Sequence, residues 1–186
     1  MARYPSKSND HRNREMISAA TKFRTSDALA AMRSEWKRMG KTVVWTNGCF
    51  DLLHAGHVRS LRAAKALGDI LIVGLNSDAG VRAIKGPLRP LVPEQDRLEI
   101  IAALEPVDYV TLFDESEPSA VLARIQPDIH CKGEDYAPGT GRPVPERDIV
   151  LAYGGRIEFL PLLEGHSTTQ LLERILASSN DASSEA

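Results

Sequence analysis

Short apolar segments alternate with helical patterns along most of this 186-residue sequence. The apolar segments expected to be strands are 42–46, 70–75, 109–113, 129–132 and 156–160. The stretches with a helical spacing of apolar residues are 26–40, 58–67, 93–104, 118–126, 146–153 and 168–177. Strands that alternate with helices in this way form a parallel sheet with right-handed crossovers. The sequence therefore predicts an α/β fold with a doubly wound, five-stranded parallel sheet and helices on both faces.

A single domain accounts for this pattern. The length suits one ordinary domain, and we expect a Rossmann-like domain over residues 26–177. Residues 1–25 carry six Lys or Arg against two Asp or Glu and show no periodicity, which indicates a poorly ordered tail. A basic tail can also contact nucleic acid or act as a targeting peptide. The polar residues 178–186 are expected to be a frayed end.

Composition excludes several classes of partner. The 23 Lys and Arg against 25 Asp and Glu give a net charge of −2, so the chain has no general attraction to nucleic acid or to an anionic membrane. The longest apolar stretch, 70–75, is far shorter than the ~20 residues of a membrane-spanning helix. Cys49 and Cys131 are too few for a disulfide framework. These features predict a cytoplasmic protein that binds neither nucleic acid nor membrane.

The segment after the first strand carries two histidines near a helix start. Parallel sheets bind ligands beyond the carboxyl ends of their strands, and here the chain reads Thr46-Asn47-Gly48-Cys49-Phe50-Asp51-Leu52-Leu53-His54-Ala55-Gly56-His57. The helix is expected to begin at about His57, where unpaired N–H groups attract anions. Protonated or N–H-donating histidines would stabilise charge on a phosphate, and Gly56 would let it approach the backbone. Two alternatives stay open: a metal held by Asp51, His54 and His57, or a histidine that caps the helix or fills the core.

A cationic loop follows the second strand. After Asn76-Ser77-Asp78 the chain carries Lys85, Arg89 and, one turn into the next helix, Arg97. Glycine and proline stiffen the loop, and its ammonium and guanidinium groups suit phosphate oxygens. The alternative interpretation is a solvated charged loop.

Two further strands end in polar turns. The turn after the fourth strand suits a nucleobase or ribose, although an ordinary loop has the same composition; it reads Lys132-Gly133-Glu134-Asp135-Tyr136. After the fifth strand, Ser167 is followed three residues later by Gln170, which is the pattern of a capping box. Hydroxyl groups and free N–H groups at that helix start also suit phosphate.

Together these segments predict a polyphosphate site, because two helix starts and a cationic loop meet at one edge of the sheet. The sequence has no Walker A pattern, and the Gly48 loop lacks the three-glycine dinucleotide fingerprint. A transferase that uses a nucleotide is therefore favoured over a hydride-transfer enzyme.

The His54-Ala55-Gly56-His57 motif, with Ser167-Thr168-Thr169 about a domain away, resembles the nucleotidyltransferase superfamily that bears the HxGH signature. Within it, residues 28–177 are most similar to the heptose 1-phosphate adenylyltransferases, through segments 46–48, 73–78, 85–90, 103–108 and 132–136. The resemblance implies transfer of AMP from ATP to heptose 1-phosphate, giving ADP-heptose and pyrophosphate for the lipopolysaccharide inner core. Because many bacteria fuse this activity to a sugar kinase, for which this chain has no room, we expect the stand-alone form.

The resemblance also implies roles for single residues. His54 and His57 would contact the α-phosphate, and Lys85 would steady the attacking phosphate. Thr168, with Ser167, would hold the departing phosphates. The implied nucleotide-binding residues are Thr46, Asn47, Gly48, Cys49, Phe50, Gly56, Lys132, Gly133, Asp135, Tyr136, Ser167, Thr168 and Thr169. The implied substrate-binding residues are Asp51, Asn76, Asp78, Lys85, Arg89 and Arg97.

Cofactor and assembly follow from the same resemblance. Mg²⁺ would bind through the ATP phosphates, without direct protein ligands, and the protein would form a homodimer or a larger homo-oligomer. The motifs do not choose the base, so a CTP-dependent cytidylyltransferase acting on glycerol 3-phosphate or another polyol phosphate is the alternative enzyme. A non-catalytic nucleotide-binding module is the alternative of another class. His166 and Glu134 depart from the family pattern and leave the base in question.

Overall fold

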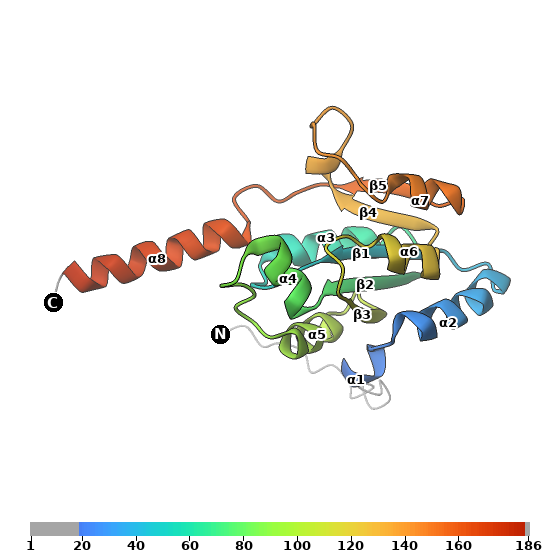
Figure 1. Cartoon of the computed structure of the whole chain (residues 1–186), viewed down its shortest axis with the longest axis horizontal. Helices are drawn as coiled ribbons and strands as arrows, with labels where there is room; N and C mark the ends of the chain where they lie inside the picture. Colours follow the sequence, from blue (N-terminus) through green and yellow to red (C-terminus); the bar gives the residue numbers. More distant parts are fainter. Residues whose placement is uncertain (1–18, 185–186) are drawn as a thin grey trace, which may run out of the picture.

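The computed structural model describes residues 19–184, which form a parallel sheet with helices on both faces (Figure 1). The sheet has five strands in the order β3-β2-β1-β4-β5. The strands are β1 (Val43–Gly48), β2 (Ile70–Asn76), β3 (Tyr109–Phe113), β4 (Ile129–Gly133) and β5 (Arg156–Leu160). This architecture confirms the α/β class, the parallel five-stranded sheet and the doubly wound, Rossmann-like arrangement predicted from the alternating pattern.

The helices divide between the two faces of the sheet. They are α1 (Ala19–Lys22), α2 (Ser26–Arg38), α3 (Ala55–Lys65), α4 (Asp78–Lys85), α5 (Glu94–Ala103), α6 (Ser119–Ile125), α7 (Arg147–Ala152) and α8 (Thr168–Ser184), with a 3-10 turn η1 (Glu134–Tyr136). Helices α3 and α5 contribute buried side chains to one core cluster, and α2, α6 and α7 contribute to the other. Helix α8 extends away from the sheet (Figure 1).

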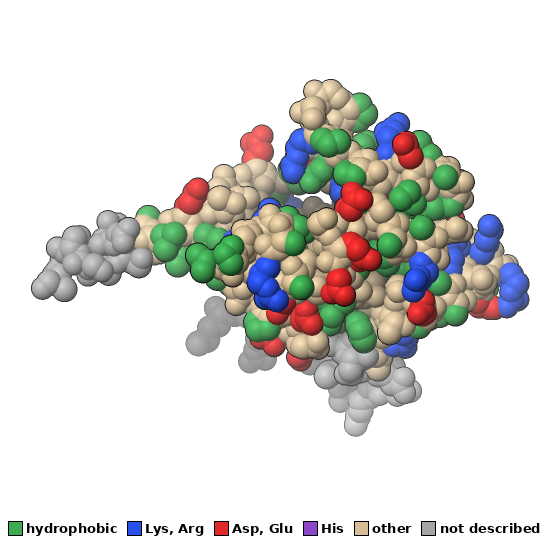
Figure 2. Space-filling view, viewed as in Figure 1, with side chains coloured by type: hydrophobic (Ala, Val, Ile, Leu, Met, Phe, Trp, Pro, Cys, Tyr) green, Lys and Arg blue, Asp and Glu red, His purple; other side chains and the backbone are tan. Residues whose placement is uncertain are grey.

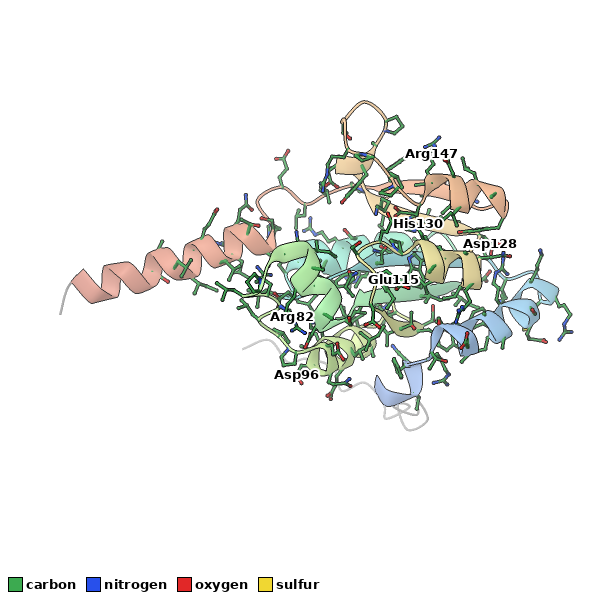
Figure 3. The ribbon with its side chains drawn as sticks, viewed as in Figure 1. Arg82, Asp96, Glu115, Asp128, His130 and Arg147 are labelled. Carbon is green, nitrogen blue, oxygen red and sulfur yellow. The ribbon has the colours of Figure 1, made fainter. Side chains whose placement is uncertain are left out.

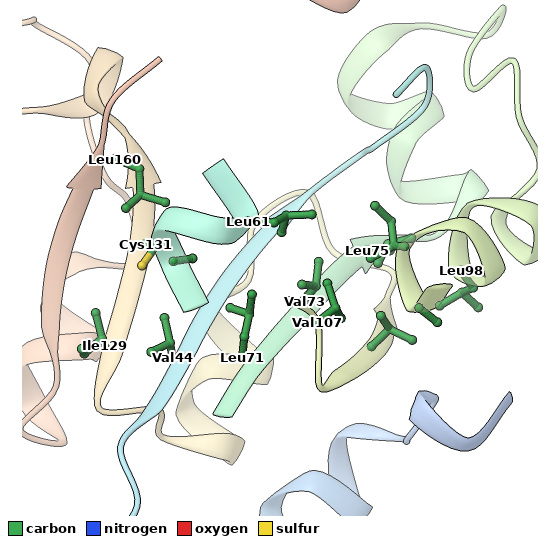
Figure 4. Close-up of a cluster of buried hydrophobic side chains, with 14 residues drawn as sticks. Val44, Leu61, Leu71, Val73, Leu75, Leu98, Val107, Ile129, Cys131 and Leu160 are labelled. Atoms are coloured by element: carbon green, nitrogen blue, oxygen red, sulfur yellow. The ribbon is translucent and has the colours of Figure 1, made fainter. Parts of the chain in front are cut away.

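Alternating burial along the strands builds both clusters. In β1, Val44 packs into the cluster with α3 and α5, whereas Val43 and Trp45 pack into the opposite one. This is the two-residue period of a strand that is covered on both faces. Figure 4 shows the first cluster, in which Val44, Leu71 and Val73 line the sheet beneath Leu61 of α3.

The strand order places a crevice beside β1. The chain builds β1, β2 and β3 outward in one direction and then returns to place β4 on the other side of β1. The helix after β1 and the helix after β4 consequently lie on opposite faces. Such a switch point opens a space at the carboxyl ends of the two strands, where ligands of this architecture bind.

Several helix boundaries differ from the sequence prediction. Helix α2 ends at Arg38, two residues before the predicted end at Gly40, and Thr25 caps its start by accepting from the N–H of Ala28. Helix α3 begins at Ala55, with His54 as its N-cap, two residues before the predicted start at His57. The segment interpreted as a loop after β2 contains α4, which Ser77 caps by accepting from the N–H of Gly80. Helix α4 spans only eight residues and begins two residues after β2 ends, so it is short enough to be taken for part of a loop.

The chain ends also differ from the expected tails. Part of the predicted N-terminal tail is structured: the N–H of Arg24 donates to Val110 O of β3 at 3.0 Å. Lys22 Nζ donates to Leu104 O at 3.2 Å. The predictions for residues 1–18 and 185–186 lie outside the described residues. At the other end, α8 continues to Ser184, past the predicted helix end at 177.

Neither the surface in view nor the helices indicate a membrane-spanning protein segment within residues 19–184. Figure 2 shows Lys or Arg and Asp or Glu side chains interspersed on the face in view. Within residues 19–184, the helices fall short of the length and apolar content that crossing a membrane requires.

Gly74 of β2 gives a test of the core packing. A Cβ atom there would overlap ring atoms Cζ2 and Cη2 of Trp45, so we expect Gly74→Ala to lower the free energy of unfolding by about 1–3 kcal/mol through overpacking. Urea unfolding measures this loss. In a Trp45→Phe background, whose smaller ring lacks both atoms, the same substitution should cost less; an equal cost in both backgrounds would contradict the packing argument.

Candidate active site

A cavity of about 730 Å³ lies at the carboxyl edge of the sheet, between the starts of α3 and α8. We call it the first cavity. It joins residues predicted from four separate segments, namely Cys49, Phe50, Asp51, His54, Gly56, His57, Lys85, Arg89, Asp135, Ser167, Thr168 and Thr169. The fold therefore brings the two histidines and the Ser-Thr-Thr segment to one place.

His54 and His57 stack against each other at the start of α3. Their ring centroids are 3.9 Å apart and their planes are inclined by 26°. The backbone N–H of His54 donates to Nδ1 of His57 over 3.4 Å. Because Nδ1 accepts, the proton of a neutral His57 ring lies on Nε2. His57 is thus an N–H donor in its neutral form.

Both imidazoles favour the neutral state. Burial, together with the charge of His54, lowers the pKa of His57 to about 4. Burial and the charge of His166 also lower the pKa of His54. Of the two forms considered from the sequence, the neutral N–H donor fits this site and the protonated imidazolium does not.

Phe50 packs beside His57, and Gly56 leaves space beside His54 at the start of α3. Phe50 has a left-handed backbone (φ 47°) and its ring lies 5.3 Å from that of His57. A Cβ atom at Gly56 would lie 2.9 Å from His54 Nδ1 and 3.4 Å from His166 Cβ. Glycine at this position therefore preserves the space beside His54, which is where a phosphate would approach the backbone.

The start of α8 closes the other side of the first cavity. Ser167 Oγ accepts from the N–H of Gln170 at 3.1 Å, the cap that the sequence pattern indicates. Thr168 Oγ1 donates to Leu52 O at 3.5 Å. This contact joins α8 to the loop after β1 and holds a second helix start near the histidines.

Asp51 anchors the segment that carries Arg89. Its buried carboxylate accepts from Arg89 Nε at 2.5 Å and from the N–H groups of Leu91 and Val92 at 2.8 and 2.9 Å. Burial alone would raise the pKa of Asp51, but the hydrogen bonds from Val92, Leu91 and Arg89 lower it. The carboxylate predicted to bind substrate is therefore already satisfied by the protein, and it positions Arg89 at the cavity wall.

Arg97 is part of the framework rather than of the cavity wall. Its side chain is 0% exposed, and it donates to Cys49 O at 2.6 Å, Asn76 O at 2.9 Å, Asp78 Oδ1 at 2.8 Å and Val92 O at 3.0 Å. These bonds tie the ends of β1 and β2 together. The sequence prediction that Arg97 binds a sugar phosphate does not fit this burial, and Asp78 is likewise occupied as its ion-pair partner.

A second cavity of about 490 Å³ adjoins the first. It is lined by the ends of β1, β2 and β4, by α4 and by two loops, and it contains the predicted residues Thr46, Asn47, Gly48, Asn76, Lys132, Gly133 and Tyr136. Cys49 and Lys85 line both cavities. The predicted nucleotide-binding residues are therefore divided between two neighbouring spaces.

Two cationic side chains, Lys132 and Arg142, pack against the ring of Tyr136 at the second cavity. Lys132 Nζ lies 4.5 Å and Arg142 Cζ 4.1 Å from the centre of the Tyr136 ring. Arg142 also donates to the Tyr136 hydroxyl at 2.9 Å and pairs with Asp135. Aromatic and carboxylate contacts hold the charged side chains in place.

Sequence reasoning assigned no role at the site to several lining residues. His166 and Gln170 line the first cavity, and Arg142 and Glu146 line the second. The sequence pattern marks Gln170 as part of a helix cap and His166 as a departure from the family pattern, and neither signal points to the cavity. Arg142 and Glu146 lie in a loop and at a helix start, and no motif marks either of them.

The structure does not support the alternative of a metal held by Asp51, His54 and His57. Among residues 19–184, no group of three or more His, Cys, Asp or Glu is arranged to hold a metal ion. Asp51, one of its three proposed ligands, is satisfied by Arg89 and two backbone N–H groups.

Comparison with known proteins shows the family of this chain. The model of the family described as cytidylyltransferase-like matches residues 45–160, the span from β1 to β5. The chain belongs to the cytidylyltransferase-like family. Within the family it is similar to "Bifunctional protein HldE" of Syntrophotalea carbinolica, with 51% identity over 84% of this chain. The protein of the same name in Pelobacter propionicus is 49% identical over the same share. This chain spans 31% of the length of each of these relatives.

Solved structures agree with the family membership. A lipopolysaccharide core biosynthesis protein from Thermoplasma volcanium is 28% identical, with a TM-score of 0.55 over 68% of this chain and 100% of that one. A pantoate-beta-alanine ligase from Francisella tularensis is 14% identical, with a TM-score of 0.50 over 75% of this chain and 66% of that one. The latter shares the fold alone.

The low pKa of His57 predicts a pH dependence of stability. His57 takes up a proton near pH 6.5 in the unfolded state but only near pH 4 in the folded state. Its contribution to the free energy of unfolding is therefore complete above pH 6.5 and is lost as the pH falls to about 4. It amounts to no more than about 3 kcal/mol. Urea unfolding between pH 7.5 and 4.5 should show less acid destabilisation in His57→Gln than in wild type. Exposed Arg59→Gln, outside the histidine cluster, is the control, and equal pH slopes in wild type and His57→Gln would refute the assignment.

The Asp51 anchor predicts a local change in dynamics. We expect Asp51→Asn to weaken the charge-assisted bonds to the 89–92 segment and to cost about 1–3 kcal/mol of stability. Amide hydrogen exchange at Leu91 and Val92 should accelerate most. Asp69→Asn, which removes an exposed carboxylate that bonds Lys41 and Thr42, is the control. Unchanged protection of Leu91 and Val92 would contradict the anchoring role.

Proposed function

We propose that this protein transfers AMP from ATP to heptose 1-phosphate, releasing pyrophosphate and forming ADP-heptose, a lipopolysaccharide inner-core precursor. The single observation that carries the proposal is the meeting of the two cavities at Lys85 and Cys49, beside the stacked histidines. Membership of the cytidylyltransferase-like family and the similarity to HldE proteins and to a lipopolysaccharide core biosynthesis protein support it.

In this proposal ATP occupies the first cavity. Its triphosphate lies between the start of α3 and the start of α8, where backbone N–H groups and helix dipoles favour anions. Ser167, Thr168 and Thr169 hold the β- and γ-phosphates, and the nucleoside lies toward Asp135 and the end of β5. Cys49, Phe50 and Gly56 line the same space.

The acceptor occupies the second cavity. Asn76, with Thr46, Asn47 and Gly48, lies at its wall, and Lys85 stands where the acceptor phosphate and the α-phosphate of ATP meet. A phosphate oxygen of the acceptor attacks the α-phosphorus, the bond from the α-phosphorus to the bridging oxygen breaks, and pyrophosphate departs with that electron pair. The chain acts by positioning and charge stabilisation, without a covalent enzyme intermediate.

Neutral histidines suit this step. The Nε2–H of His57 donates to the oxygen on which charge grows, and it needs no change of protonation to do so. Lys85 supplies a full positive charge at the same junction. Arg89, held by Asp51, adds a guanidinium at the wall of the first cavity.

Mg²⁺ is expected to arrive with ATP as part of the substrate. The carboxylates at the first cavity are largely committed, since Asp51 pairs with Arg89, Asp135 pairs with Arg142 and Glu134 accepts from the N–H of Leu162. This donor set fits an ion that is coordinated mainly by phosphates and water. Its chemistry is to neutralise phosphate charge as pyrophosphate leaves.

Location and assembly complete the proposal. We place the protein in the cytoplasm, where ATP is available, as a single catalytic domain over residues 26–177 in a homodimer or larger homo-oligomer. Light scattering after size-exclusion chromatography measures the assembly.

A substrate panel tests the function directly. Wild-type protein is incubated with Mg²⁺, with ATP or CTP, and with heptose 1-phosphate or glycerol 3-phosphate, while pyrophosphate is measured. We expect release with ATP and heptose 1-phosphate. Release with CTP and glycerol 3-phosphate alone would establish the alternative enzyme, and nucleotide binding without release in any combination would indicate a non-catalytic binding module.

The role of His57 predicts a specific kinetic defect. We expect His57→Ala to lower kcat by about 10²-fold, the effect of removing one preorganised donor from a developing charge, with a smaller change in the KM for ATP. Lys41→Met, at the opposite edge of the sheet, serves as the control for an unrelated substitution. A kcat equal to that of wild type would show that His57 has been given the wrong role.

A further inference from the structure

A buried carboxylate lies beneath the second cavity and bonds two side chains of β4. Glu146 and His130 are both 0% exposed. Glu146 Oε1 lies 2.8 Å from His130 Nε2 and 2.8 Å from Lys132 Nζ. Figure 3 labels His130 on β4, in the interior of the domain. The proposed mechanism gives this trio no role, although the sequence prediction placed Lys132 among the nucleotide-binding residues.

Burial and hydrogen bonding act on the charges of the trio. Burial alone would raise the pKa of Glu146, but the hydrogen bonds from His130 and Lys132 and the charge of Lys132 lower it to about 2. Burial lowers the pKa of His130, against the opposing effect of Glu146. Glu146 is therefore a carboxylate and His130 a neutral N–H donor. A buried carboxylate needs a cation beside it, and Lys132 is that cation.

Lys132 is the member of the trio that reaches a cavity. Its side chain is 14% exposed, and it lines the second cavity but not the first. An ammonium group has three N–H donors, and the contact with Glu146 uses one. The Tyr136 ring, 4.5 Å from Nζ, flanks the amine. These contacts restrict a long flexible side chain to one position at the cavity wall.

The second cavity is suited to an anion. Lys85, Lys132 and Arg142 line it, with Glu117 and Glu146 as its acidic residues. Lys132 and Glu146 form an ion pair that is neutral as a whole, so Lys132 contributes N–H donors to the cavity rather than net charge. Positive charge comes from Lys85 and from Arg142, which also pairs with Asp135. A phosphomonoester carries two negative charges near neutral pH and has several acceptor oxygens, so it matches these donors.

We propose that Lys132 binds the phosphate of the acceptor, opposite the nucleotide, and that Glu146 and His130 are positioning residues that fix its ammonium group. This inference rests on the proposed function, because it takes the second cavity as the acceptor site. It moves Lys132 from the nucleotide-binding set predicted from the sequence to the acceptor side. The contact with Glu146 fixes the amine and leaves two N–H donors of Lys132 for a ligand of the cavity that Lys132 lines.

Steady-state kinetics with both substrates tests the assignment. We expect Lys132→Met to raise the KM for the acceptor at least 10-fold while the KM for ATP changes less than 2-fold. Glu146→Gln keeps the shape and one acceptor oxygen but removes the charge, so it should raise the acceptor KM by a smaller factor, about 3-fold or more. Lys132→Arg, which keeps the charge, should recover part of the loss.

Matched controls separate this role from a structural one. Glu158→Gln removes the carboxylate that bonds Arg156 on β5 and should leave both KM values unchanged, as should Lys41→Met. An increase in the KM for ATP alone would return Lys132 to the nucleotide site and overturn the inference. Lower thermal stability of Lys132→Met and Glu146→Gln with unchanged kinetics would show that the trio only supports the fold, which also overturns it.

The inference and the proposed function can fail separately. If wild-type protein uses glycerol 3-phosphate instead of heptose 1-phosphate, the proposed function fails, and the same KM comparison with glycerol 3-phosphate decides the role of Lys132. If neither acceptor is used, calorimetric titration with heptose 1-phosphate in the presence of a non-hydrolysable ATP analogue replaces kinetics. Binding weakened at least 10-fold in Lys132→Met supports the inference, and equal binding, or none in wild type, refutes it.

Discussion

The parallel alignment of β1 between β2 and β4 is the constraint on which the rest of the structure depends. Parallel strands end at the same edge of a sheet, so every segment that follows a strand is delivered to that edge. The change of direction between β1 and β4 then separates the helices that follow them and leaves a crevice between. Residues as distant in sequence as His54 and Thr168 share a cavity for this reason.

Buried ion pairs stiffen the crevice rather than bind in it. Arg97 pairs with Asp78 and joins the ends of β1 and β2 from inside the protein. Asp51 pairs with Arg89 and holds the 89–92 segment. Removing one partner of such a pair leaves an uncompensated buried charge, so the pairs favour a single arrangement of the loops. Lys85, at the junction of the two cavities, is left as the cation that both spaces share.

This edge of the sheet carries two kinds of hydrogen-bond donor, neutral histidine N–H groups and charged lysine and arginine side chains. Burial and the charge of a neighbouring histidine lower the pKa of both imidazoles, with His166 acting on His54 and His54 acting on His57. Both rings therefore contribute N–H groups without adding repulsion between like charges. Lysine and arginine side chains carry the positive charge, and each of Arg89, Lys132 and Arg142 is held by an acidic or aromatic neighbour. Preorganised donors of this kind lower the cost of placing several phosphate groups close together.

The sequence by itself determined the strands, most of the helices, the parallel α/β class and the two helix starts that meet at the first cavity. Hydrophobic periodicity, caps and the His54-to-His57 and Ser167-to-Thr169 motifs are local, so they can be interpreted without knowing what packs against them. Tertiary structure alone decided the partners of the charged side chains. Asp51 and Arg89 are 38 residues apart and Arg97 and Cys49 are 48 apart, and nothing in either segment indicates that they meet. The burial of Arg97, the division into two cavities and the support of Lys132 by Glu146 follow from such long-range contacts, because burial and charge pairing depend on the whole fold.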